Sequence, residues 1–404
     1  AEPGDLILLL GRKSNENQGA SRQQLDFVSG ELRTEVAKKV GINVSKNWNF
    51  CWVTDFPMFE YDKVDQRFTA MHHPFTSPNF EDIEHLDKNP GKVRSLGYDI
   101  VMNGYELGGG SIRIPSSFCG TYGIKPTLGR VPKISMGSLN QPPAHNILTQ
   151  SGPITRNVED AAILLDVISG SDPRDVLSPN LPIENFLEAC AGEVEGLKIG
   201  WTPDFGYTPV DPEVLEITKR SALSLESLGC SVEESDLKLV NPTEHFLHIF
   251  ACMIAGSRNS PKTLDFNQLT DYAQEGFKAA STFSGADYSV ALGYTRLMIS
   301  QFEEQFQKFD LLISPTMSVK AFEIDNNPSV INNINVDPIW GYTPFTHPIN
   351  MIGYPAASIP CGFSDDGLPI GLHIIGRHSD EKTIFKLSSA IEKSKPWPAA
   401  RSIN

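Results

Sequence analysis

The 404-residue sequence lacks long apolar runs, and no segment approaches the roughly 18 residues that a membrane helix needs. Its start also lacks the basic and then apolar pattern of a secretory signal. Positive charge is in deficit, because 34 Lys and Arg stand against 49 Asp and Glu, for a formal net charge of −15. Such a balance argues against a broad basic surface for nucleic acid or anionic lipid. The sequence therefore predicts a cytoplasmic protein with neither membrane nor DNA as a partner.

Cysteine is scarce, and the six that occur form no Cys-x-x-Cys pair and no Cys/His spacing typical of a metal site. This pattern predicts reduced thiols in the cytosol and no metal site. Internal repeats and low-complexity tracts are absent as well. At about 150 residues per domain, the length is typical of two or three domains, or of one large enzyme.

The first 110 residues have the pattern of one helix and several antiparallel strands. Ser21 and Gln24 have the spacing of a capping box, and apolar residues then repeat at helical intervals until Gly41. Proline or glycine follows several short runs rich in β-branched and aromatic residues, which is typical of strand ends. Strands are predicted over residues 5–10, 50–56, 68–73 and 99–103.

Beyond Pro115 helices alternate with short apolar strands, which favours a layered α/β arrangement. Asn157 is the predicted N-cap of one helix, and Asp211 with Pro212 opens another that Gly229 closes. A long helix is predicted over 286–309 and a last one after Ser379, with strands at 197–201, 311–314, 357–360 and 371–375.

The segment between these two regions carries the most chemical information. Gly108, Gly109 and Gly110 precede Ser111, so backbone N–H groups can approach a ligand closely and a hydroxyl can reach an acyl carbon. A tight turn between two elements explains the same residues equally well. The sequence after the glycines separates these alternatives.

From Gly109 onward the chain resembles the amidase signature family, serine hydrolases that cleave carboxamides. This resemblance implies that Ser111 is the nucleophile and that the amides around Gly108, Gly109 and Gly110 form the oxyanion hole. It also implies a layered α/β fold, a small-molecule amide as substrate and no cofactor. The matching stretches are Gly109–Pro132, Ser151–Asp175, Leu197–Asp204, Phe309–Thr316, Pro344–Phe363 and Gly367–Gly376.

The sequence departs from this family before Ser111. Family members activate their nucleophile with a serine in a cis peptide and a lysine base, both on its N-terminal side. No Ser-Ser-Gly stretch precedes Ser111, the upstream lysines stand in no family context, and Leu107 replaces the expected aspartate. General-base assistance supplies about 10²–10⁴-fold in rate, so we expect impaired hydrolysis by an incomplete amidase fold.

Residues 1–114 instead resemble bacterial-type aspartyl-tRNA synthetase, a class II enzyme. The resemblance implies part of an antiparallel α+β sheet, with Glu106 as a carboxylate of the ATP site and His72 and Arg113 as aspartate-binding residues. ATP and Mg²⁺ are the expected cofactors if this remnant binds ligands, whereas tRNA is not an expected partner because the anticodon-binding domain is absent. The matching stretches are Trp52–Asp62, Thr69–Pro78 and Gly97–Ile114.

Each of these three residues also has a simpler interpretation. His72 then has a structural role, Arg113 is a buried ion-pair partner, and Glu106 is a solvated or paired carboxylate.

Both families contain Gly-Gly-Ser-Ile-Arg-Ile at this place, and the switch between them falls on it. The hypothesis is a chimera, with a partial synthetase region at 1–110 and an amidase region at 111–404. The alternatives are an aspartate-tRNA ligase fragment that retains ATP-dependent aspartate activation, and a fusion product without biochemical function.

Overall fold

The computed structural model describes residues 112–133, 147–178, 184–257, 271–323 and 326–397, together with short segments between 50 and 106. The chain divides into two compact units, Ala1–Leu107 and Gly108–Asn404, which are described separately below. The helix predicted after Ser21 and the strand predicted at 5–10 lie outside the described residues.

The described part of the Ala1–Leu107 unit consists of antiparallel strands. Strand β1 (Phe50–Val53) pairs with β4 (Asp99–Met102), which pairs with β5 (Tyr105–Glu106). Strands β2 (Phe59–Asp62) and β3 (Arg67–Ala70) form a separate antiparallel pair. The antiparallel pattern predicted for this region is confirmed, with shorter strands than the sequence suggests.

A short 3₁₀ turn, η2 (Pro90–Lys92), precedes the ion pair that ties this region together. The Arg94 side chain donates from Nε to Asp82 Oδ2 at 2.7 Å, and its backbone N–H donates to the same oxygen at 2.9 Å. These hydrogen bonds from Arg94 lower the pKa of Asp82 to about 2.

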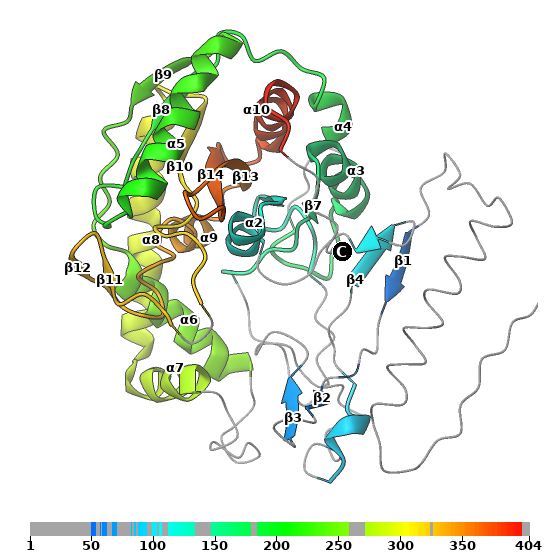
Figure 1. The fold of residues 1–404 in the computed structure, drawn as a ribbon. Helices are drawn as coiled ribbons and strands as arrows, with labels where there is room; N and C mark the ends of the chain where they lie inside the picture. The colour runs from blue at the N-terminus through cyan, green and yellow to red at the C-terminus, as the bar shows by residue number, and fades with distance from the viewer. Residues whose placement is uncertain are drawn as a thin grey trace, which may run out of the picture. The chain divides into compact units, whose positions relative to one another are not determined.

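A seven-stranded mixed sheet forms the centre of the Gly108–Asn404 unit (Figure 1). Its two central strands, β13 and β14, are antiparallel, whereas the β10, β8 and β9 edge is parallel. The strand order is β7 (Ile154–Thr155), β6 (Tyr122–Lys125), β13 (Ala356–Phe363), β14 (Pro369–Gly376), β10 (Leu311–Pro315), β8 (Lys198–Trp201) and β9 (Ser231–Glu234). A separate two-stranded pair joins β11 (Val330–Ile331) to β12 (Ile334–Asn335).

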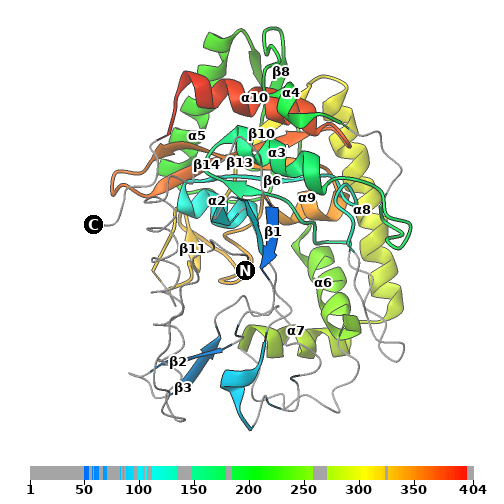
Figure 2. The ribbon, with the colours of Figure 1, turned by 90° about the vertical axis from the view of Figure 1, so that its right-hand side faces the viewer.

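Helices cover both faces of this sheet (Figure 2). One face carries α3 (Val158–Ile168), α4 (Phe186–Ala189), α5 (Pro212–Ser224), which continues into the 3₁₀ turn η3 (Leu225–Leu228), and α10 (Glu381–Ser394). The other face carries α2 (Arg113–Cys119), α6 (Thr243–Ser257), α8 (Gly285–Phe306) and α9 (His347–Ile352), with α7 (Asp271–Thr282) packed against α6. The layered α/β fold predicted for this region is confirmed.

The helix ends follow the capping residues read from the sequence. The Asn157 side chain accepts from the Asp160 N–H at 2.7 Å, and Asp211 accepts from two N–H groups in the first turn of α5. Gly229 closes the following 3₁₀ turn in the left-handed region, with φ at 86°. These three predicted boundaries are confirmed.

Helix α2 is the element that the sequence pattern did not predict. It begins at Arg113, directly after the glycine-rich stretch, and contains Pro115 at its third position. Proline is compatible with the first turn of a helix, because an N–H there has no intrahelical partner. Gly120 then ends the helix in the left-handed region.

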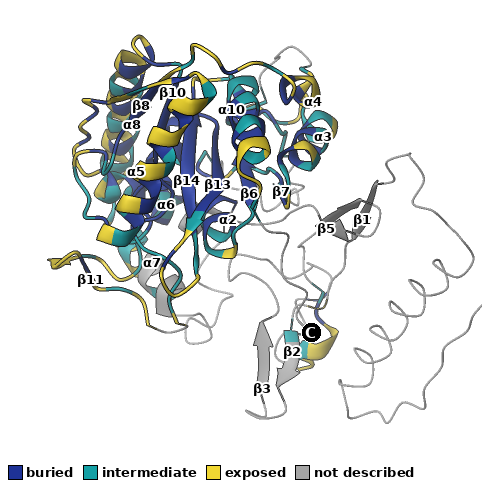
Figure 3. Ribbon diagram, turned by 45° about the horizontal axis from the view of Figure 1, so that its top comes forward, coloured by how far each residue is buried: buried dark blue, intermediate teal, exposed yellow. Residues whose placement is uncertain are grey.

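The apolar core lies between the sheet and the helices, where the central strands are buried (Figure 3). Ile124, Ile313, Ala357 and Ile374, which alternate with more polar residues along their strands, are each 0 % exposed. Among the described helices, none is both long and apolar enough to cross a membrane.

Candidate functional site

Most residues predicted to act in chemistry lie outside the described part of the chain. These are Ser111, Gly108, Gly109, Gly110 and His72. Their predicted roles remain predictions.

The structure places the other two predicted residues in different units. Glu106 lies in strand β5 of the Ala1–Leu107 unit, and its predicted ATP-site role stays a prediction. Arg113 is the first residue of α2 in the Gly108–Asn404 unit, two positions after Ser111.

Arg113 is buried, with 4 % of its surface exposed, and it crosses from α2 to two other elements. Its Nη1 lies 2.9 Å from His373 Nε2 on β14. Its Nη2 donates to the Thr346 carbonyl at 2.9 Å and to the side-chain oxygen of Asn350 on α9. The simpler interpretation of Arg113 predicted burial and an ion pair. The burial is found, but these partners are a ring nitrogen and two neutral oxygens.

His373 belongs to a row of residues that crosses four neighbouring strands. Gly123 of β6 pairs with Ser358 of β13, Ser358 pairs with His373, and His373 pairs with Ser314 of β10. Directly paired residues on neighbouring strands share one face of a sheet, so these four residues form a continuous row. The three side chains in the row are 0 % exposed. We call Gly123, Ser358, His373 and Ser314 the polar row.

The polar row faces helix α2, and glycines make room for the serine hydroxyls of that helix. A Cβ atom on Gly123 would lie 2.1 Å from Ser116 Oγ. A Cβ atom on Gly371, on the same face of β14 as His373, would lie 2.6 Å from the hydroxyls of both Ser117 and Ser358. Alanine at either glycine would therefore displace α2 from the sheet.

Positive side chains dominate this face. Burial lowers the pKa of Arg113 to about 9. Burial, followed by the Arg113 charge, also lowers the pKa of Lys125 well below its ordinary range. Lys125 Nζ donates to the neighbouring Pro126 carbonyl at 2.9 Å.

The two histidines beside Arg113 are held in the neutral form. Burial, reinforced by the charges of Arg113 and Lys125, lowers the pKa of His373 well below its ordinary value. Burial also lowers the pKa of His347 to about 4, and the Arg113 charge acts in the same direction. A buried, positively charged surface of this kind costs free energy of folding, and such perturbed groups gather preferentially at functional sites.

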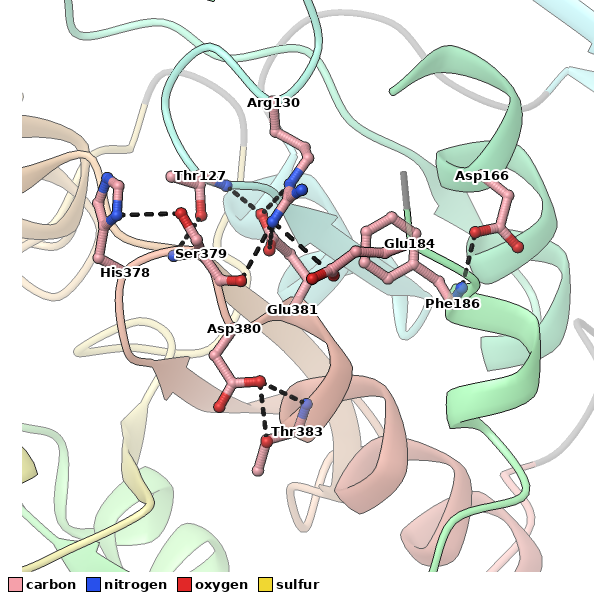
Figure 4. Close-up of polar contacts among 10 residues, drawn as sticks. All are labelled: Thr127, Arg130, Asp166, Glu184, Phe186, His378, Ser379, Asp380, Glu381 and Thr383. Carbon is pink, nitrogen blue, oxygen red and sulfur yellow. Dashed lines mark hydrogen bonds and ion pairs between the residues drawn. The ribbon is translucent and has the colours of Figure 1, made fainter. Parts of the chain in front are cut away.

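A second charged cluster, on the opposite face, has the features of a structural ion pair (Figure 4). Arg130 donates to both oxygens of Glu381, from Nη2 to Oε2 at 2.8 Å and from Nε to Oε1 at 3.2 Å. The Thr127 N–H donates to Glu381 Oε1 at 2.8 Å, and the Glu184 carboxylate lies 3.8 Å from Arg130. The Phe186 ring centroid lies 5.7 Å from the guanidinium carbon.

Burial alone would raise the pKa of Glu381, but hydrogen bonds from Arg130 and Thr127 lower it below its ordinary value. Glu381 is the first residue of α10, and Thr127 and Arg130 lie in the segment after β6. The pair therefore ties α10 to that segment.

Within the described ranges, no three His, Cys, Asp or Glu side chains gather closely enough to hold a metal ion. A phosphate-binding glycine loop is not part of the described site either. The chemistry available on the α2 face comes from hydroxyl, imidazole, guanidinium and amine groups.

Sequence reasoning missed His373, Ser314, Ser358 and Lys125. The signal was present as polar or glycine residues at every second position of apolar strands, as in Gly371-Leu372-His373-Ile374. That alternation shows which side chains share a face, but the strand pairing that joins them into one row is a tertiary property.

Two family models match the chain. One, described as Amidase, covers residues 107–385, and the other, described as tRNA synthetases class II (D, K and N), covers residues 17–122. The two matches overlap at 107–122, the stretch that contains the shared Gly-Gly-Ser-Ile-Arg-Ile run.

Curated relatives include one of the subunits of glutamyl-tRNA(Gln) amidotransferases. The chain is 35% identical over 318 residues to this protein from Geobacillus stearothermophilus, which covers 72% of the chain and 62% of the relative. With the same protein from Listeria monocytogenes serotype 4a it is 36% identical over 412 residues, covering 91% and 82%. The Listeria alignment therefore extends into the unit that the synthetase model also matches. The chain spans less than two thirds of the length of the Geobacillus relative.

Solved structures show the same likeness. A bacterial aryl acylamidase of the amidase signature family matches with a TM-score of 0.64 and 31% identity, over 72% of this chain and 61% of that one. The corresponding Thermotoga maritima protein of glutamyl-tRNA(Gln) amidotransferase matches with a TM-score of 0.55 and 30% identity, over 72% and 61%. These matches confirm the predicted amidase-type α/β fold.

Proposed function

Because the chain belongs to the amidase family, we propose that its Gly108–Asn404 unit cleaves the C–N bond of small carboxamides with Ser111 as nucleophile. The observation that carries this proposal is the polar row beneath α2, the helix that begins two residues after Ser111. A buried polar surface at that place costs folding free energy, and a hydrolytic site accounts for its presence.

The proposed reaction proceeds through an ester on Ser111. The hydroxyl oxygen adds to the carbonyl carbon as its proton leaves, and backbone N–H groups around Gly108, Gly109 and Gly110 stabilise the oxyanion. The C–N bond breaks as the leaving amine takes up a proton, and water then hydrolyses the ester to the carboxylic acid.

We further propose that this activity is weak. The serine and lysine that activate the nucleophile in the amidase signature family have no counterpart in family context between Ala1 and Ser111. Loss of general-base assistance lowers a rate by about 10²–10⁴-fold.

The contacts of Arg113 support the amidase role of this segment over an aspartate-binding role. His373, Thr346 and Asn350 engage two of its nitrogens inside the Gly108–Asn404 unit. A guanidinium holds a carboxylate most strongly when two of its N–H groups point together at the ligand.

Hydrolysis of simple aryl and aliphatic amides tests the proposal. We expect slow turnover that the Ser111→Ala variant abolishes, while Cys119→Ala, a matched change of an exposed thiol at the end of α2, leaves it unchanged. Turnover that persists in Ser111→Ala would remove Ser111 from the mechanism.

The names of the relatives suggest two substrate classes, aryl amides and the glutamine amide used by an amidotransferase. We propose a small amide without tRNA, and comparison of an acetanilide with glutamine in the presence and absence of tRNA tests this. Glutamine hydrolysis that tRNA accelerates would contradict the small-amide proposal.

The overlap of the two family matches supports a chimera joined within residues 107–122. A long genomic read across the codons for Gly104 to Gly123 tests this proposal, and finding the two halves at separate loci would contradict a natural fusion.

A second candidate function is aspartate activation with ATP and Mg²⁺ by the Ala1–Leu107 unit, with Glu106 and His72 in the roles predicted from the synthetase resemblance. Aspartate-dependent pyrophosphate exchange would support it. Absence of both exchange and ATP binding would remove it, and failure of the amidase assay as well would favour a fusion product without biochemical function.

A further inference from the structure

We propose that His373 is a positioning residue, whose neutral imidazole holds Arg113 and, through it, the segment that carries Ser111. This inference rests on the proposed function of Ser111 but concerns a contact that is defined without it. Arg113 opens α2 directly after that segment, and His373 lies at the centre of the polar row, 260 residues further along the chain.

The hydrogen bonds fix which ring nitrogen of His373 carries the proton. A guanidinium can only donate, so Nε2, which lies 2.9 Å from Arg113 Nη1, must be the acceptor. The single proton of the neutral ring then resides on Nδ1, 3.5 Å from Ser314 Oγ. The Ser314 hydroxyl donates onward to the Pro315 carbonyl at 2.9 Å, which leaves its oxygen free to accept from the ring.

This chain of donors runs in one direction, from Arg113 to His373 and from His373 through Ser314 to the backbone. A proton added at His373 Nε2 would remove the acceptor for Arg113 and place two cations against each other. The groups facing the ring include Arg113 from α2 and Lys125 from β6, with His347 of α9 on the other side of Arg113. All three are basic groups, so none of them stabilises a charged imidazole.

The other contacts of α2 do not replace this one. Ser116 and Ser117 fit against Gly123 and Gly371, which sets the height of α2 above the sheet. Hydroxyl packing of this kind allows sliding along the strands, whereas a hydrogen-bonded guanidinium fixes both position and direction. Arg113 is also the member of this set nearest in sequence to Ser111, so its displacement affects the nucleophile most directly.

Two substitutions at His373 separate positioning from packing. In His373→Gln, a side-chain oxygen can accept from Arg113 while the amide N–H₂ donates toward Ser314. His373→Leu fills a similar volume but leaves the Arg113 N–H without a partner. His378→Gln is the matched control, because His378 is exposed and contacts the Ser379 hydroxyl on the surface.

The readout is the second-order rate at which a fluorophosphonate modifies Ser111 in the full chain, followed by intact mass as a function of pH. We expect His373→Gln and His378→Gln to stay within about threefold of the unchanged chain, and His373→Leu to fall by about tenfold or more, the effect of one unsatisfied buried donor. The pH profile of the unchanged chain should fall on the acid side, and this limb should be lost in His373→Gln. Equal rates in the Leu and Gln variants would overturn the proposal.

A second measurement holds even if Ser111 is unreactive or if His373→Leu does not fold. Histidine labelled with ¹⁵N in the full chain reports the tautomer of each ring, and the resonance lost in His373→Gln identifies His373. We expect a protonated Nδ1 and a bare Nε2 at pH 7, and a shift of that signal in Arg113→Gln. A protonated Nε2 would overturn the proposal. The expected tautomer with an unreactive serine would instead count against the proposed function alone.

Discussion

Replacing Glu381 by glutamine tests whether the buried ion pair holds the Gly108–Asn404 unit together. The Glu381 side chain is 0 % exposed and the Arg130 side chain is 4 % exposed, and they share two hydrogen bonds. Glutamine keeps the size of the side chain and an oxygen for the Thr127 N–H, but it removes the negative charge. Arg130 is then left as a buried cation with Glu184 as a distant counter-charge at 3.8 Å.

Removal of one partner from a buried ion pair costs about 3–5 kcal/mol, because the remaining charge is desolvated without compensation. Glu184 and the Ser379 carbonyl, which accepts from Arg130 at 3.1 Å, reduce that loss. We therefore expect Glu381→Gln to lower the free energy of unfolding by about 3 kcal/mol, the lower end of this range.

Urea unfolding of the full chain, followed by far-UV circular dichroism, measures the loss as a shift in midpoint. Asp236→Asn is the control, because Asp236 and Lys308 form a pair with side chains 69% and 52% exposed, and such pairs contribute at most about 1 kcal/mol. The double variant Arg130→Met/Glu381→Leu should regain most of the stability, since it leaves no buried charge. Equal shifts in Glu381→Gln and Asp236→Asn would refute the reasoning.

Two further predictions concern the α2 face. Because burial moves the pKa of His347 from 6.5 to about 4, the unfolded chain binds a proton in that interval that the folded chain does not. Stability should therefore fall by roughly 3 kcal/mol in total as the pH drops from 6.5 to 4, and His347→Gln should flatten the dependence of the urea midpoint on pH. Gly371→Ala should cost about 1–3 kcal/mol, because its Cβ would lie 2.6 Å from the Ser117 and Ser358 hydroxyls. The exposed helical Gly293 has open space around it, so Gly293→Ala should instead be neutral or stabilising by up to about 1 kcal/mol, and a thermal melt that ranks the two variants otherwise would contradict this packing.

Local features of the fold could be predicted from the sequence wherever a few neighbouring residues determine them. Asn157 and Asp211 cap their helices through side chains that reach only two or three residues ahead. Pro212 and Gly229 mark a start and an end for reasons of backbone geometry alone. These positions required no knowledge of the tertiary structure.

The candidate site could be predicted only in part, because its contacts join distant segments. Arg113 was identified from its motif, but its partners stand 233 to 260 positions away, and no local rule selects them. His373 reads as one polar residue in an apolar strand until the pairing with Ser358 and Ser314 places it in a row. Helix α2 was not predicted, since the glycines before it and Pro115 within it are typical of loops.

The most direct test of the central claim is whether Ser111 forms an acyl ester. Brief incubation of the full chain with an aryl acetate, followed by acid quenching and peptide mapping, identifies the modified side chain. The account predicts one added acetyl group on the peptide that contains Ser111, and none on that peptide in Ser111→Ala. An acetyl group found on another residue, or no adduct at all, would contradict it.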